Sequence, residues 1–177
     1  VAGLTAAVNT FAGALPVDPL AEPVIPRDRS AVDPAALLHG VREGYEVREY
    51  LWTGDIDATL YDEDCVFTDP TLSFKGLDTF LRNVGNLRPI LKRLVRDRTV
   101  ELYELAQDEV DREVRASWRM AGTIELPWKP RIDLRGQTRF RYRAPEEGGR
   151  IYEYIETWEL AAGEALAQLL RPGNKEI

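Results

Sequence analysis

The fold is decided by residues 131–143, RIDLRGQTRFRYR, which carry the clearest two-residue period in the chain. Apolar or small side chains alternate there with charged or amide side chains, as in a strand with one face buried and one face in solvent. The inward positions are Ile132, Leu134, Thr138, Phe140 and Tyr142, and the outward positions are Arg131, Asp133, Arg135, Gln137, Arg139, Arg141 and Arg143. Burial on one side predicts an antiparallel sheet that is covered on one face.

The stretches on both sides of this strand continue the period of two. Residues 100–105 and 114–120 predict two preceding strands. Residues 151–160 predict a following strand, after a turn at 145–149. These four segments form a long antiparallel meander.

Three helices are predicted ahead of the meander, at residues 34–52, 56–61 and 77–87. A short strand at 65–68 interrupts them, and a short helix at 164–170 follows the last strand of the meander. Helices that precede an antiparallel sheet are typical of the α+β class, with the helices packed on one face.

An extended, proline-rich arm is predicted over residues 1–33, because five of the eleven prolines lie within residues 16–34 and proline lacks the backbone donor that helices and central strands need. We expect one folded domain over residues 34–171 and a tail over 172–177. The uncharged residues 1–17 are too short and too weakly apolar for a membrane span. The chain is expected to be a fragment or a processed product.

The charge of the chain limits the classes of partner that it can bind. With 23 Lys and Arg against 30 Asp and Glu, the net charge is −7, which argues against a general nucleic-acid binder. The net charge is −9 over residues 1–74, +6 over 75–143 and −4 over 144–177. The single cysteine, Cys65, excludes a disulfide within the chain, and the single histidine, His39, leaves few ligands for a metal. We therefore expect no metal and no cofactor.

The order of elements and several motifs resemble the nuclear transport factor two-like superfamily, which includes ketosteroid isomerase, scytalone dehydratase and polyketide-cyclase-like proteins. The motifs are Gly54-Asp55, Tyr61 with Asp62-Glu63-Asp64, Val66-Phe67-Thr68-Asp69-Pro70 and Lys75-Gly76-Leu77. Over about residues 35–160 the chain is similar to a plant and algal family of unknown function. This similarity is carried by Trp118-Arg119-Met120-Ala121-Gly122-Thr123, Leu126-Pro127-Trp128-Lys129-Pro130, Arg150-Ile151 and Glu156-Thr157-Trp158.

The resemblance implies a cone-shaped domain, with three N-terminal helices packed on a curved antiparallel sheet and a cavity for a small apolar ligand between them. It also implies a chloroplast or plastid location, as a soluble or peripherally associated protein. A homodimer formed across the sheet faces is a further implication.

Asp69 is the candidate general base, because the catalytic aspartate of ketosteroid isomerase lies in a similar turn before a proline. Burial in an apolar cone would raise the pKa of this carboxyl and suit it to proton transfer near neutral pH. The alternative is ordinary turn chemistry, in which the aspartate bonds the backbone that follows it. The isomerase's other polar groups are not matched, since Val47 stands where its tyrosine is expected and Gln137 or Thr138 where its second aspartate is expected.

A ligand pocket is predicted where side chains of the first helix and of several strands face the cone. Its walls are Tyr45, Phe67, Trp118, Met120, Phe140, Tyr154, Glu156 and Trp158. Glu156 is the second acid of this pocket, because it shares a strand face with Tyr154 and Trp158. The alternative, and the commoner role of aromatic side chains at strand spacing, is to fill the core.

A partner surface is predicted on the outer face of the sheet. It consists of Trp128, Arg131, Arg135, Arg139, Arg141 and Arg143. The alternative for the arginines is a solvated face neutralised by Glu113, Glu153 and Glu159 on the adjoining strands. The alternative for Trp128 is a rigid loop folded over the mouth of the cone.

Three functions remain open at this point. The preferred hypothesis is a non-enzymatic accessory, assembly or scaffold domain that binds a protein partner, because no complete catalytic set is present. A small-molecule binder that uses the cone is one alternative. An isomerase, dehydratase or cyclase that uses Asp69 as general base is the other.

Overall fold

Six strands form one sheet in the order β2-β1-β6-β5-β4-β3, in a computed structural model that describes residues 30–85 and 93–173. The strands are β1 (Tyr61–Thr68), β2 (Ser73–Lys75), β3 (Val95–Asp108), β4 (Glu113–Ile124), β5 (Arg131–Tyr142) and β6 (Ile151–Trp158). Strands β3 to β6 form the predicted antiparallel meander. Strand β1 pairs with β6 in parallel, so the sheet is mixed rather than wholly antiparallel.

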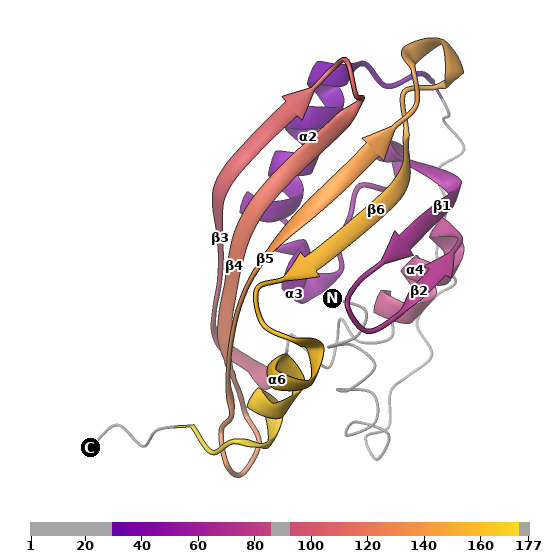
Figure 1. Ribbon diagram of the computed structural model, residues 1–177. Helices are drawn as coiled ribbons and strands as arrows, with labels where there is room; N and C mark the ends of the chain where they lie inside the picture. Colours follow the sequence, from indigo (N-terminus) through magenta and orange to yellow (C-terminus); the bar gives the residue numbers. More distant parts are fainter. Residues whose placement is uncertain (1–29, 86–92, 174–177) are drawn as a thin grey trace.

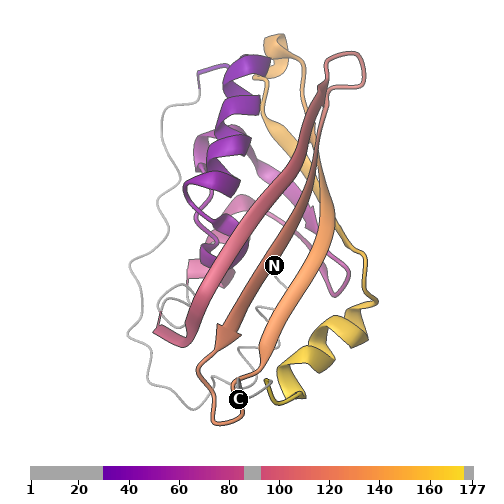
Figure 2. The same ribbon diagram turned by 90° about the vertical axis from the view of Figure 1, so that its left-hand side faces the viewer.

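Three helices, α2 (Pro34–Glu46), α3 (Tyr50–Thr53) and α4 (Leu77–Gly85), lie on one side of this curved sheet (Figures 1 and 2). The side chain of Asp33 caps α2 by accepting a hydrogen bond of 2.9 Å from the backbone N–H of Ala36, which satisfies one of the free amides at the helix start. The helices and the inner face of the sheet enclose one core. This is the α+β cone that the sequence predicts.

The helix boundaries differ from the predicted ones in two places. The first predicted helix, 34–52, is divided, because Glu49 takes a left-handed backbone conformation with φ of 48° between α2 and α3. The second, 56–61, is reduced to the 3₁₀ turn η1 (Ala58–Leu60), since strand β1 begins directly after it. The predicted end of the third helix, at residue 87, lies outside the described residues.

Strand β5 alternates as its sequence predicts. Its even-numbered residues from Ile132 to Tyr142 are buried, and its odd-numbered residues lie on the outer face, exposed or half-buried. The one glycine of the strand, Gly136, lies under the ring of Trp118 on β4, where an added Cβ would come within 2.7 Å of that ring. The indole of Trp118 thus fills the space that a side chain at Gly136 would need.

The last helical segment closes the side of the sheet where β6 stops. It consists of α6 (Ala162–Ala167) and the 3₁₀ turn η3 (Gln168–Leu170). The side-chain amide of Gln168 accepts a hydrogen bond from the N–H of Asp133 at 2.8 Å and donates one to its carbonyl at 2.9 Å. Because β6 pairs with β5 only from Gly136 onward, this amide continues the ladder along β5.

The end of the predicted arm is attached to the loop between β5 and β6. The N–H of Val32 donates to the carbonyl of Gly148 at 3.0 Å. The buried guanidinium of Arg150 donates to the carbonyls of Ser30 and Thr59. The rest of the arm, 1–29, lies outside the described residues. Within the described part of the chain, no helix combines the length and apolar character that crossing a bilayer requires.

Candidate functional site

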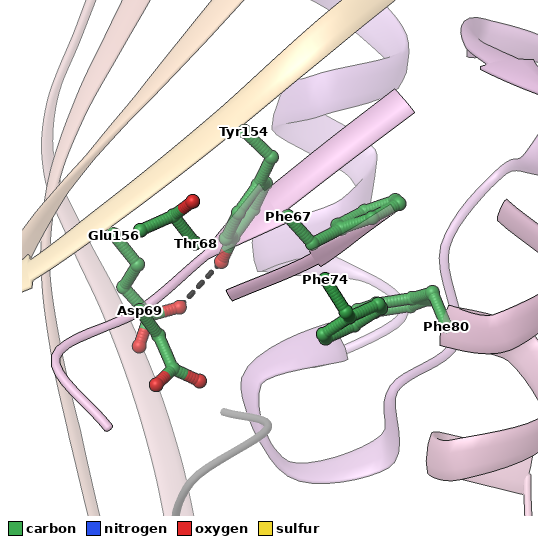
Figure 3. Close-up of a pocket in the computed structure, with 7 residues that line it drawn as sticks. All are labelled: Phe67, Thr68, Asp69, Phe74, Phe80, Tyr154 and Glu156. Carbon is green, nitrogen blue, oxygen red and sulfur yellow. Dashed lines mark hydrogen bonds between the residues drawn. The ribbon is translucent and has the colours of Figure 1, made fainter. Parts of the chain in front are cut away.

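A small pocket lies among the inner faces of β1, β2, α4 and β6 (Figure 3). Its free volume is about 10 Å³, which is room for about one water molecule. We name it the acid-aromatic pocket, and it is lined by Phe67, Thr68, Asp69, Phe74, Phe80, Tyr154 and Glu156.

Aromatic rings form one wall of the acid-aromatic pocket. Phe67 lies at their centre, with ring centroids 4.4 Å from Phe80, 5.6 Å from Phe74 and 5.7 Å from Tyr154. Phe67, Phe74 and Phe80 are stacked, with interplanar angles below 20°. Only Phe74 of these four side chains is half-buried rather than buried, because it stands on the short edge strand β2. Phe74 is thus the part of the wall that meets solvent.

Two carboxylates, those of Asp69 and Glu156, form the opposite wall (Figure 3). Glu156 is 2% exposed. Its carboxylate accepts hydrogen bonds from the hydroxyl of Tyr154 and, at 2.6 Å, from the indole N–H of Trp158. All three side chains stand on β6 at intervals of two, so they share the inner face of the sheet. The strand itself orients the carboxylate toward the pocket.

Behind Glu156 a line of tyrosine hydroxyls runs through the core. The hydroxyl oxygens of Tyr50 and Tyr154 are 3.2 Å apart, and those of Tyr50 and Tyr45 are 2.9 Å apart. Burial raises the pKa of all three hydroxyls above the ordinary value, and the negative charge of Glu156 raises it further. These hydroxyls therefore stay protonated at neutral pH, and the line joins helices α2 and α3 to the pocket.

Asp69 performs the turn chemistry that was the alternative to catalysis. Its Oδ1 accepts hydrogen bonds from the N–H of Thr71 at 2.8 Å, the hydroxyl of Thr71 at 2.5 Å and the N–H of Leu72 at 3.1 Å. Burial raises the pKa of this carboxyl, whereas the hydrogen bonds from Thr71 and Leu72 stabilise its charged form and lower the pKa. The turn therefore opposes the rise that burial predicts. Its role as general base stays a prediction.

The predicted pocket residues are divided between the pocket and the core. Phe67, Tyr154 and Glu156 line the acid-aromatic pocket, and Trp158 contacts it through Glu156. The remaining four are buried in the core, as the core interpretation predicts: Tyr45, Trp118, Met120 and Phe140. Trp118 donates its indole hydrogen to the hydroxyl of Thr138 at 2.9 Å, on the neighbouring strand.

Sequence reasoning did not identify Thr68, Phe74 and Phe80 of the pocket lining, or Tyr50 behind it. Phe80 belongs to the apolar stripe of α4, where helical spacing indicates only burial. Phe74 lies between a proline turn and Gly76, in a stretch to which no element was assigned. Tyr50 belongs to the predicted first helix, and its contact with Tyr154 spans 104 residues. Only a three-dimensional contact brings these side chains to Glu156.

The arginines of the predicted partner surface fall into two groups. The first group has acidic partners: Arg139 pairs with Glu113 at 4.0 Å, Arg141 with Glu153 at 3.0 Å, and Arg143 with Asp62. This group fits the alternative of a solvated face whose charge is neutralised by neighbouring acids. Arg131 and Arg135 are exposed, and within the described residues no carboxylate lies within 4.0 Å of either. Of the predicted neutralising acids, Glu113 and Glu153 do pair with these arginines.

Trp128 lies in the loop between β4 and β5 and anchors the end of the chain. It is half-buried, and its indole N–H donates to the carbonyl of Leu169 at 2.8 Å. Its own carbonyl accepts from Gly173 at 2.9 Å. The indole is therefore folded onto the C-terminal helical segment. Among the residues described, no group of three or more His, Cys, Asp or Glu side chains is placed to hold a metal ion.

Comparisons with known proteins identify a family and a fold. The family model of DUF2358, described as an uncharacterized conserved protein, matches residues 38–153. No curated protein matches the chain.

Three solved structures are similar to this one, and two of them are described as NTF2-like. An NTF2-like protein from Burkholderia thailandensis is 18% identical, with a TM-score of 0.54 over 77% of this chain and 98% of that one. An NTF2-like protein of unknown function from Burkholderia pseudomallei is 12% identical, with a TM-score of 0.53 over 72% and 92% of the two chains. The BvnE pinacolase from Penicillium brevicompactum is 15% identical, with a TM-score of 0.50 over 75% and 92%. These similarities establish the fold alone.

Proposed function

We propose that this chain, which belongs to the DUF2358 family of uncharacterized conserved proteins and has the NTF2-like fold, binds a small molecule in the acid-aromatic pocket. The observation that carries the proposal is the burial of Glu156 at the wall of that pocket, where the residue is 2% exposed. Placing a carboxylate in an apolar interior is unfavourable even when it is hydrogen-bonded, and a leucine would fill the same space without that cost. Such groups concentrate at binding and catalytic sites.

The chemistry of the two walls defines the class of ligand. The rings of Phe74 and Phe80 suit a flat apolar body, and the carboxylate of Glu156 suits a hydroxyl or N–H donor at one end of that body. Tyr154 and Trp158 hold the carboxylate in position before the ligand arrives. A phenol or an indole has this combination of groups.

Entry of such a ligand requires one wall to move, because the free volume is about 10 Å³. Phe74 is the side chain that can move with least loss of contact. It is half-buried and stands on a strand of three residues that pairs with β1 alone. Rotation of its ring toward solvent would join the pocket to the surface.

The direct test compares phenol with toluene, which differ in the hydroxyl that Glu156 would accept. We expect titration of the folded protein, followed by NMR shifts of the pocket aromatics, to show phenol bound at least tenfold more tightly than toluene. Glu156→Gln keeps the shape of the side chain and removes its charge, so it should reduce that preference about tenfold. Phe74→Ala should tighten the binding of both compounds.

Glu153→Gln is the matched control, because Glu153 lies on the same strand and faces the outer side of the sheet. It should leave the binding of both compounds unchanged. Equal affinity for phenol and toluene in the unaltered protein, or a preference that survives Glu156→Gln, would contradict the proposal.

Proton transfer at the same pocket is a second candidate function. It is favoured by the two carboxylates that line one wall and by the tyrosine line behind them. An isomerase, dehydratase or cyclase reaction of this kind would use one carboxylate as general base. On a substrate found by screening, loss of the true base should reduce the rate 10²–10⁴-fold. Comparison of Asp69→Asn with Glu156→Gln would then show which of the two carboxylates is the general base.

The accessory or assembly role and the plastid location remain predictions. Reversing the charge of Arg139 and Arg141 tests the first, because recovery of a partner in a pull-down should then fall. The location is tested by imaging a fluorescent fusion of the protein in plant cells.

A further inference from the structure

The positively charged side chains on the outer face of the sheet differ between its two ends in whether they have carboxylate partners. At the end where the β3–β4 turn lies, Arg115 and Arg139 share Glu113, Arg141 pairs with Glu153, and Arg143 with Asp62. At the opposite end, exposed cations come from several separate segments. We name this cluster the basic end, and it consists of Arg93, Arg96, Lys129, Arg131, Arg135 and Arg171.

None of the six has an ion pair within 4.0 Å among the residues that the structure describes. This separates them from Arg119, which lies directly opposite Arg135 and bonds both oxygens of Asp133. The arginines of β4 and β5 near the β3–β4 turn thus have carboxylate partners, and the six cations of the basic end have none among the described residues.

The sheet register brings these cations together. Thr123 on β4 lies opposite Arg131 on one side and Arg96 on the other, so the three stand in one row across the sheet. Directly opposed residues have Cβ atoms about 5 Å apart. The Cβ atoms of Arg96 and Arg131 are thus roughly 10 Å apart, with Thr123 between them. Arg135 stands four residues along the same strand face from Arg131.

Two backbone hydrogen bonds bring the remaining cations of the cluster to the β4–β5 loop. The N–H of Glu125 donates to the carbonyl of Leu94, which fastens the segment of Arg93 to the β4–β5 loop that carries Lys129. The N–H of Gly173 donates to the carbonyl of Trp128, which brings Arg171 to the same loop. The acids that the register or these bonds place beside the six cations are Asp97, Glu125, Glu159 and the half-buried Asp133, which is bonded to Arg119. The cluster keeps a positive balance.

Apolar side chains stand among these cations. Leu170 is 65% exposed and directly precedes Arg171. Leu126 is half-buried and Pro127 is exposed in the loop that carries Lys129. In Figures 1 and 2 this loop, the start of β3 and the C-terminal helical segment all lie at the lower end of the sheet.

We propose that the basic end docks on an anionic lipid bilayer. Cations without carboxylate partners can contact headgroup phosphates without first breaking an ion pair, and their spread over a broad surface fits many separate phosphates rather than a single bound anion. Leu170 and Pro127 would enter the interfacial region, as the apolar side chains of peripheral proteins do. An acidic polypeptide matches the charge but not the exposed leucine. The net charge of −7 disfavours nucleic acid.

Vesicle co-sedimentation tests this proposal. We expect the 177-residue chain to sediment with vesicles of phosphatidylcholine and phosphatidylglycerol, and not with phosphatidylcholine alone. Binding should weaken as salt rises, because screening shortens the reach of the surface potential. Since each Lys or Arg near an anionic membrane changes partitioning about fivefold, Arg131→Glu with Arg135→Glu should weaken binding by ~25-fold or more. Leu170→Asn should weaken it further, by about tenfold.

Arg139→Glu with Arg141→Glu is the matched control, because it makes the same change in net charge on the same face of the same strand. This control should still sediment. Equal loss in both double variants, or equal binding to both kinds of vesicle, would overturn the proposal. So would retention on immobilised polyglutamate without binding to the vesicles, which would assign the basic end to an acidic protein. Circular dichroism of each variant confirms that the fold is kept.

Discussion

Tyr154 donates its hydroxyl hydrogen to the carboxylate of Glu156, two residues further along strand β6, inside the folded core. The second oxygen of that carboxylate accepts from Trp158, two residues further again. One strand face therefore supplies both the acid and the donors that make its burial tolerable.

Tyr154→Phe removes one of these donors and one link of the tyrosine line. We expect the free energy of unfolding to fall by about 1–2 kcal/mol, because a buried carboxylate and the hydroxyl of Tyr50 each lose a partner. Urea denaturation measures the change. Tyr152→Phe is the control, because Tyr152 lies under the guanidinium of Arg143 on the outer side. An equal loss in both variants would show that the buried hydroxyl has no special role.

Asp69→Ala removes three hydrogen bonds from the turn between β1 and β2, whereas Asp69→Asn can keep the acceptor oxygen. We expect the alanine variant to lose about 1–3 kcal/mol of unfolding free energy and the asparagine variant to lose less than half of that. Chemical denaturation followed by tryptophan fluorescence measures both. Equal losses in the two variants would mean that the charge, and not the turn geometry, is what matters at this position.

The ion pair between Arg119 and Asp133 predicts a pH dependence of stability. The hydrogen bonds and the charge of Arg119 hold the pKa of Asp133 below its ordinary value. A carboxyl whose pKa is lowered by folding stabilises the protein above the unfolded pKa, near pH 4, and loses that contribution as the pH falls through the folded pKa. The stability difference between the unaltered protein and Asp133→Asn should therefore shrink from pH 6 to pH 3. A constant difference across that range would contradict the assignment.

Gly136→Ala and Gly163→Ala should change stability in opposite directions. At Gly136 a Cβ would come within 2.4 Å of the Thr157 carbonyl and 2.7 Å of the Trp118 ring, so we expect a loss of about 1–3 kcal/mol. At Gly163, in α6, a Cβ would meet nothing within 4 Å, so alanine should stabilise the protein by about 0.4–1 kcal/mol. Thermal unfolding of both variants checks the pair of predictions.

The local patterns of the sequence were sufficient for the meander and for the starts of α2 and α4. Strand β5 follows its alternation residue by residue, because one face of it packs on the core. Asp33 caps α2 because a short carboxylate directly before a proline meets the free amides of the first turn. Both features depend only on residues close together in the chain.

The features that the sequence did not predict depend on distant residues. Val66 and Phe67 of β1 pair in parallel with Glu153 and Tyr154 of β6, and no local period encodes that pairing. The pKa of Asp69 depends on how many donors its turn supplies, a number that the dipeptide with Pro70 does not fix. The ion pair of Arg143 with Asp62 spans 81 residues.

The amide of Gln168 has a consequence for the behaviour of the protein in concentrated solution. An open strand edge is a template on which another chain can add a strand, and such addition leads to aggregation. By occupying both the N–H and the carbonyl of Asp133, one side chain blocks that template at the point where β6 ends. The side-chain amide of Gln168 thus prevents self-association at this strand edge. Gln168→Ala would expose the edge while leaving the core intact.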